Sequence, residues 1–285
     1  MMNIPATGHN GQVRRVALLS PLAVFATFSQ HRDLIWQMTK RDVIGRYRGS
    51  IMGLLWSFFN PVLMLAVYTF IFSVVFQARW GEATTSKADF AIVLFVGLII
   101  HTLFAECVNR SPSIILSNVN YVKKVVFPLE ILPWITLGSA LFHALVSVLV
   151  LLVFVEFTQL HLSWTALLLP LVLLPFILLI MGVSWFLASL GVFIRDVGQM
   201  TGMVTTVMMF LSPIFYPMSS LPETYRVWLN LNPLTFIVEQ GRAVLLWGNA
   251  PDWIGLGLYT MVAVAIAYGG LMWFQMTRRG FADVI

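Results

Sequence analysis

The chain has 285 residues, of which 59% are hydrophobic and 10% are charged, and its mean hydropathy is +0.87. A soluble domain carries about 25% charged residues, so this composition excludes an ordinary water-facing surface and predicts a protein that uses lipid as its solvent. The net charge of +5 is typical of positive flanks on membrane spans, and we expect no nucleic-acid partner. The single cysteine, Cys107, excludes an intrachain disulfide, and the five separated histidines form no ligand pair, so we expect no metal site.

Residues 1–50 are expected to form a cytoplasmic N-terminal segment. Its part from His31 to Ser50 is polar and basic, which is typical of a helix that lies at the membrane surface. Three of its arginines, Arg41, Arg46 and Arg48, are candidates for contact with the phosphates of lipid or substrate. An ordinary positive flank of a span is the alternative explanation for them.

Residues 51–285 are expected to form an all-α transmembrane domain. A spanning helix needs about 20 apolar residues, and six windows provide them, at about 51–76, 90–108, 131–155, 164–192, 197–216 and 253–276. The middles of these windows carry no Asp, Glu, Lys or Arg. That argues against a carrier driven by protons or sodium ions, because such carriers place ionisable residues at mid-membrane.

The positive charges outside these windows alternate between the two sides. Thirteen Lys and Arg fall in one set of alternate segments and four in the other. The positive-inside rule puts the richer set, and with it both termini, in the cytoplasm.

Two connecting segments have helical signals of their own. Ser111-Pro112 is a typical helix start, so residues of about 111–127 are predicted to form a short cytoplasmic helix that docks on a soluble partner. A solvated connector is the alternative. On the other side, residues of about 219–251 hold two short apolar pieces that Asn232-Pro233 separates. They predict two short re-entrant helices before the last span rather than a plain loop.

Aromatic side chains are frequent near the first span and are candidates to line a path for a sugar chain, since rings contact sugars without holding them tightly. Tyr68, Phe72 and Phe76 are spaced by four residues and are expected to share one helix face. Lipid contact or core packing is the alternative. The full set of candidates is Trp56, Phe59, Tyr68, Phe72, Phe76 and Tyr216.

Two patterns carry a family resemblance. The first is Arg-Tyr-Arg-x-Ser-x-x-Gly-x-Leu-Trp-x-x-x-Asn-Pro at 46–61. The second combines Ser212-Pro213-Ile214 and Tyr216-Pro217 with Pro222, Asn232, Pro233, Glu239 and Arg242. Together, in six-span order, they resemble the membrane subunit of type-2 ABC exporters, and most of all the branch that exports O-antigen and other lipid-linked bacterial polysaccharides.

The resemblance implies a homodimer in the bacterial inner membrane, with the glycan passing between the two copies. Two copies of a separate cytoplasmic ATPase would bind ATP and Mg²⁺, and this chain would hold no cofactor. The cargo would be an undecaprenyl-diphosphate-linked polysaccharide. The segment 111–127 would couple to the ATPase through Ser113, Asn118, Tyr121, Lys123 and Lys124, with the basic helix before the first span as a second contact. Pro222, Asn232, Pro233, Glu239 and Arg242 would belong to an extracytoplasmic gate.

Other functions remain possible from the sequence. Another type-2 exporter, for teichoic acid, capsule or drugs, is the nearest alternative. An ATP-independent flippase and a membrane-embedded glycan enzyme are more distant ones. The sequence has no G-x-x-x-x-G-K-[ST] motif and no cluster of nucleophiles, acids or metal ligands, so we expect a transporter subunit rather than an enzyme.

Overall fold

The computed structural model describes residues 23–75, 87–123, 127–157 and 163–285, and within these ranges every regular element is a helix. The α-helices are α2 (Ala23–Gln30), α3 (Arg32–Arg46), α4 (Trp56–Tyr68), α5 (Lys87–Arg110), α6 (Val119–Lys123), α7 (Leu132–Phe157), α8 (Leu169–Phe193), α9 (Val197–Leu211), α10 (Glu223–Asn230), α11 (Pro233–Leu245), α12 (Trp253–Thr277) and α13 (Phe281–Val284). Short 3₁₀ turns extend several of them, and α4 continues as a π-helix over Thr69–Val75. The expected all-helical class is confirmed.

Five helical stretches among the described residues are long and apolar enough to cross a membrane, which makes the chain a multi-pass membrane protein. Counted with the turns that extend them, they are Gly53–Phe72, Phe90–Ser113, Leu129–Phe157, Trp164–Phe193 and Trp253–Val284.

The window at 197–216, expected to be a full span, holds only the 15-residue helix α9. At about 1.5 Å per residue α9 reaches roughly 22 Å, which is less than the hydrocarbon thickness of about 30 Å. The helix stops because Pro213 disfavours helical geometry at Ser212, whose φ of −93° and ψ of 151° are extended.

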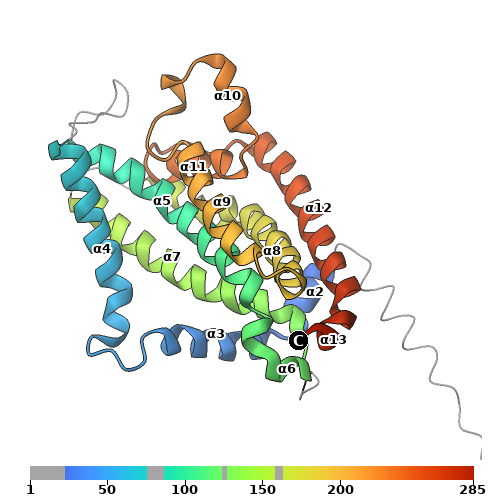
Figure 1. Cartoon of the computed structure of the whole chain (residues 1–285). Helices are drawn as coiled ribbons and strands as arrows, with labels where there is room; N and C mark the ends of the chain where they lie inside the picture. The colour runs from blue at the N-terminus through green and yellow to red at the C-terminus, as the bar shows by residue number, and fades with distance from the viewer. Residues whose placement is uncertain (1–22, 76–86, 124–126, 158–162) are drawn as a thin grey trace, which may run out of the picture.

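The short helices gather at the two ends of the bundle. Figure 1 shows α3, α6 and α13 at one end and α10 and α11 at the opposite end. We call the first the basic end, because α3 alone carries four Lys and Arg residues, and the second the far end. The segments 31–50 and 111–123 therefore lie on one side of the bundle and 219–251 on the other, which is the arrangement that the charge pattern predicts.

The spans differ in how much of their surface the chain itself covers. Most of α5 is buried, so it forms the centre of the bundle, whereas α4 is almost entirely exposed. Figure 1 shows α4 standing at the side of the bundle. Its exposed side chains are large and apolar, and include Phe58, Phe59, Val62, Leu63, Met64 and Val67. A surface of this kind suits lipid or a second protein chain, but not water.

Helices α8 and α12 pack against each other through glycines. A Cβ atom on Gly270 would lie 2.1 Å from the carbonyl oxygen of Gly182, and one on Gly182 would lie 2.4 Å from the carbonyl oxygen of Ile266. Only a residue without a side chain allows the two backbones to approach so closely.

The segment 111–127 is not the single helix that the sequence predicts. It forms 3₁₀ turns at Ser111–Ser113 and Leu116–Asn118, followed by α6. Ser117 and Asn118 donate side-chain hydrogen bonds to the carbonyls of Ser113 and Ile114. Such local bonds to the backbone compete with regular helix, which explains the broken course of the segment.

Candidate functional site

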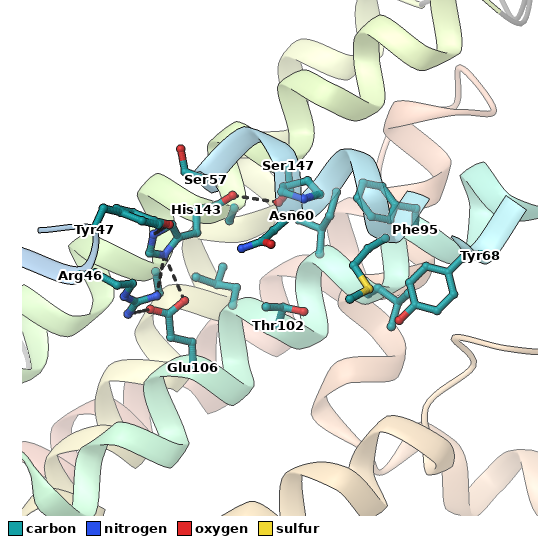
Figure 2. A pocket seen from close by; sticks show the side chains of 17 residues that line it. Arg46, Tyr47, Ser57, Asn60, Tyr68, Phe95, Thr102, Glu106, His143 and Ser147 are labelled. Carbon is teal, nitrogen blue, oxygen red and sulfur yellow. Dashed lines mark hydrogen bonds and ion pairs between the residues drawn. The ribbon is translucent and has the colours of Figure 1, made fainter. Parts of the chain in front are cut away.

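A cleft of about 280 Å³ opens between α4, α5 and α7, next to the end of α3. Figure 2 shows that polar groups from all three helices and from the end of α3 point into it. They are spaced by three or four residues on each helix, which places each pair on one face. The polar lining consists of Arg46, Tyr47, Ser57, Asn60, Thr102, Glu106, His143 and Ser147. These side chains form a polar patch on α4, α5 and α7, which are otherwise mostly apolar.

Four of these residues, Arg46, Tyr47, Glu106 and His143, are in mutual contact and form what we call the Arg46 cluster. Arg46 Nη2 donates to Glu106 Oε1 at 2.5 Å, and Arg46 Nη1 lies 3.2 Å from His143 Nδ1. That same ring nitrogen is 3.3 Å from Glu106 Oε2, while Nε2 lies 3.0 Å from the Tyr47 hydroxyl. The side chains of Glu106 and His143 are 13% and 15% exposed, whereas Arg46 is 37% exposed. Arg46 is therefore the member that faces the opening.

A second ion pair joins the Arg46 cluster to α3. Arg110 donates to both carboxylate oxygens of Asp42, at 2.9 to 3.0 Å, and also lies 3.6 Å from Glu106. Burial raises the pKa of Asp42, but the hydrogen bonds and charge of Arg110 outweigh burial, so the pKa lies below its ordinary value. Asp42 is thus ionised at neutral pH. Two arginines face two carboxylates, and the formal charges of the network cancel.

A second polar constellation lies at the far end, around Arg242. This side chain is fully buried, and it donates to the carbonyl oxygens of Val93, Pro213 and Ile214 at 3.0, 2.6 and 3.1 Å. It also pairs with Glu239 at 2.9 Å. One guanidinium therefore links α11 to α5 and to the turn that follows α9.

Asn232 adds a second link to the same turn. Its Oδ1 accepts from the backbone N–H of Leu234 at the start of α11, and its Nδ2 donates to Ser212 Oγ at 2.9 Å. Pro233 occupies the first helical position, where it removes no intrahelical hydrogen bond, and its carbonyl oxygen accepts from the Tyr259 hydroxyl. The bundle thus has one polar network near each end, the Arg46 cluster at the basic end and the residues around Arg242 at the far end.

The model of the ABC-2 type transporter family matches residues 33–246. The chain belongs to the ABC-2 type transporter family. It is a permease, the membrane subunit of a type-2 ABC exporter, and the family resemblance drawn from the two sequence patterns is confirmed.

Similar curated proteins are named for O-antigen export or for polysialic acid transport. The O-antigen export system permease protein RfbA of Myxococcus xanthus is 28% identical over 258 residues, which cover 90% of this chain and 96% of that protein. A protein of the same name from Klebsiella pneumoniae is 27% identical over 256 residues, 89% of this chain and 95% of its own length. The polysialic acid transport protein KpsM of Escherichia coli is 24% identical over 247 residues, with coverages of 82% and 90%.

The three candidate phosphate-binding arginines of this permease lie in different surroundings. Arg46 is in the cluster, paired with Glu106. Arg41 is exposed and donates to the Tyr121 hydroxyl at 3.1 Å, which joins α3 to the segment 111–127. Arg48 is exposed at the basic end. The structure thus brings only Arg46 to the cleft.

The aromatic candidates also separate. Tyr68 lines the cleft, but Phe72 stacks on Phe90 and Phe215, with ring centres 5.2 and 6.2 Å apart. Trp56 donates to Ser50 and packs edge-on against Phe59. Tyr216 donates to the carbonyl of Phe210. Phe76 lies outside the described residues.

The coupling candidates are found at the basic end. Tyr121 stacks on Phe127 with ring centres 4.4 Å apart, and Lys123 is exposed. Ser113 donates to the carbonyl of Arg110, as Asn118 does to that of Ile114. Lys124, like residues 1–22, lies outside the described residues. Of the gate candidates, Pro222 precedes the first turn of α10, and the other four belong to the Arg242 constellation.

Sequence reasoning missed the partners of Arg46. Glu106 lies within the window 90–108, whose apolar character predicts a span, and His143 is one of five histidines that are separated in the sequence. A carboxylate inside an apolar run is a signal in itself, because such a group is rarely buried without a partner. Among the described residues no group of three or more His, Cys, Asp or Glu side chains is placed to hold a metal ion.

Proposed function

We propose that this permease exports a lipid-linked polysaccharide of the O-antigen type across the bacterial inner membrane. The observation that carries the proposal is the similarity, over about nine tenths of the chain, to permeases named for O-antigen export. The weaker similarity to KpsM supports a capsule-type polysaccharide as a second candidate cargo.

The polar groups at the basic end suit the head of such a cargo. An undecaprenyl-diphosphate-linked chain combines an anionic diphosphate with neutral sugars. The guanidinium of Arg46, which pairs with Glu106, is partly exposed at the opening of the cleft, and Arg41 and Arg48 lie at the same end. Guanidinium groups bind phosphate oxygens with two parallel hydrogen bonds, so we assign the diphosphate to this end and the aromatic side chains to the sugars.

We propose that two copies form the conduit, because α4 leaves a large apolar surface uncovered. The aromatic side chains of α4, Trp56 and Phe59 among them, would lie close to the path between the copies. The short helix α9 and the turn after it would complete a sixth crossing, which places both termini in the cytoplasm. The far-end helices α10 and α11 would then form the extracytoplasmic gate.

The power source in this proposal is a separate ATPase, present in two copies, which binds ATP and Mg²⁺. It would dock at the basic end on the segment 111–127, where Lys123 is exposed and Tyr121 contacts α3 through Arg41. Movement of this segment would pass to α3 through that contact and then to α5 through Asp42 and Arg110.

The proposal is tested in a strain that lacks the permease. We expect lipid-linked polysaccharide to accumulate on the cytoplasmic side and the wild-type gene to restore it at the cell surface. The variant with Arg46→Ala and Arg48→Ala should reduce export while the protein still assembles with its ATPase. Unchanged surface polysaccharide in the deletion strain would contradict the proposed cargo, and an altered lipid-linked glycan without any transport defect would indicate an enzyme.

A further inference from the structure

The Arg46 cluster contains a conflict of hydrogen bonding. His143 Nδ1 lies within hydrogen-bond distance of both an arginine donor and a carboxylate acceptor, at 3.2 and 3.3 Å. A ring nitrogen that carries a proton can donate to Glu106 but cannot accept from Arg46, and one without a proton can only accept. Tyr47 is compatible with either arrangement, because its hydroxyl can donate to Nε2 or accept from it. The cluster therefore has two alternative arrangements.

The two arrangements differ in whether His143 donates to Glu106 or accepts from Arg46. In one, Glu106 accepts from both His143 and Arg46 Nη2. In the other, His143 accepts from Arg46 Nη1 and no longer holds the carboxylate. Arg110 lies 3.6 Å from Glu106, one helical turn further along α5. A carboxylate released from Arg46 would thus have a second cation within reach and would not be left as an unpaired buried charge, which is the costly outcome.

Arg46 itself would keep its position in the second arrangement. Its Nη1 stays on His143, and Nη2, which Glu106 occupies, can pass to another anion that displaces Glu106 at the opening of the cleft. With Glu106 in place the cluster carries no net charge, and its arginine has no unpaired charge to attract a phosphate.

We propose that Glu106 is an exchangeable counter-ion, which occupies Arg46 in the empty permease and yields it to the diphosphate of the lipid-linked cargo while His143 holds the guanidinium in place. This inference rests on the proposed function and adds to it the residue that sets the affinity of the site. Glu106 excludes weakly charged headgroups, because only an anion that competes with a carboxylate displaces it from Arg46. The same step moves negative charge towards Arg110, and so towards α3.

Binding of undecaprenyl diphosphate tests the proposal, with the uncharged alcohol undecaprenol as the control lipid. The full-length permease, purified with its ATPase and placed in nanodiscs, is titrated with each lipid. Glu106→Gln should bind undecaprenyl diphosphate at least tenfold more tightly than wild type and undecaprenol equally well. Glu130→Gln is the matched control, because Glu130 is also 13% exposed and also pairs with an arginine, Arg278 at 2.8 Å. It should bind like wild type.

Two further variants keep the test decisive. Adding Arg46→Gln to Glu106→Gln should abolish the gain in affinity. His143→Phe, which keeps a ring but removes both nitrogens, should weaken diphosphate binding at least fivefold. If Glu106→Gln does not fold, this variant is used to test the proposal instead. Unchanged or weaker binding by a folded Glu106→Gln, an equal gain in Glu130→Gln, or wild-type binding by His143→Phe would overturn the exchange. If wild type itself does not distinguish undecaprenyl diphosphate from undecaprenol, the proposed cargo site fails as well.

Discussion

Arg242 provides the sharpest test of the far-end structure. Its guanidinium is fully buried and donates to three backbone carbonyls and one carboxylate, which lie on three segments of the chain. Arg242→Gln removes the charge and most of the donors. The carbonyls of Val93, Pro213 and Ile214, which belong to buried residues, would then lose this donor. The carbonyl of Val93 keeps the helical hydrogen bond of α5, so those of Pro213 and Ile214 are the most affected. Each buried group left unsatisfied costs about 1–3 kcal/mol.

The expected loss is smaller than the sum of these contacts. Glu239 is 31% exposed, so it regains water when its partner is lost, and buried pairs broken on one side typically cost about 3–5 kcal/mol. For a chain of this size each kcal/mol corresponds to about 2–4 °C in the midpoint of thermal unfolding. We therefore expect the midpoint of Arg242→Gln to fall by roughly 6–20 °C.

The single cysteine supplies the assay. Cys107 is 1% exposed in α5, so a thiol-reactive dye labels it only when the bundle opens. Labelling is followed during heating for wild type, Arg242→Gln and Arg226→Gln. Arg226 is the matched control, because it also donates to two backbone carbonyls at the far end but is only half-buried, and those carbonyls are accessible to water.

We expect Arg226→Gln to stay within about 2 °C of wild type, because surface substitutions usually change stability by less than about 0.5 kcal/mol. Arg242→Lys should lie between wild type and Arg242→Gln, because it keeps the charge but cannot reach all four acceptors. Equal midpoints for Arg242→Gln and Arg226→Gln would show that the buried contacts of Arg242 do not stabilise the far end.

Three further predictions concern other parts of the molecule. Gly270→Ala should destabilise the permease by about 1–3 kcal/mol or prevent its assembly, because the added methyl would lie 2.1 Å from a carbonyl oxygen of α8. The control is Gly269→Ala, which should melt like wild type because an added Cβ has no neighbouring atom within 4 Å. Equal melting of the two variants would contradict the close packing of α8 and α12. Lys123→Glu should weaken ATPase binding several-fold, mostly at low salt; a pull-down as strong as that of wild type would remove Lys123 from the docking surface. Asp42 has a lowered pKa, so its pairing with Arg110 stabilises the fold above the ordinary pKa of 3.8 and is lost as the pH falls through the lower folded value. Asp42→Asn should therefore cost about 1–3 kcal/mol at neutral pH and nothing in strong acid, as measured by tryptophan fluorescence melting, and a cost independent of pH would exclude this electrostatic role.

The apolar windows predicted the helices because the length and apolar character of a span are read directly from the sequence. The limits of α9 were predicted less well. Pro213 ends that helix inside its window, although the run of apolar residues continues to Tyr216. Hydropathy reports which residues tolerate lipid, and it does not report where the backbone stops being helical.

The surroundings of the aromatic candidates could be predicted only in part from helical spacing. Tyr68 and Phe72, four residues apart, both pack against the cluster that includes Phe90, Leu94 and Ile214, although the chain becomes a π-helix at Thr69. The other neighbours of each ring depend on tertiary packing. Tyr68 also lines the cleft, whereas Phe72 stacks on Phe90 and Phe215.

The polar networks depend on contacts between distant parts of the chain. Arg46 is 60 residues from Glu106 and 97 from His143, and Arg242 is 149 residues from Val93. The sequence patterns identified Arg46 and Arg242 as important residues. Only the packing of the helices shows that Arg46 is paired with Glu106 at the opening of a cleft and that Arg242 is buried as a structural link.

Transport by purified components tests whether the permease depends on a separate ATPase. The permease is reconstituted into liposomes alone and together with its ATPase, and the movement of a lipid-linked polysaccharide across the bilayer is followed with and without ATP. We expect the glycan to accumulate on one side only when the ATPase and ATP are both present. Accumulation against a gradient by the permease alone would contradict this dependence.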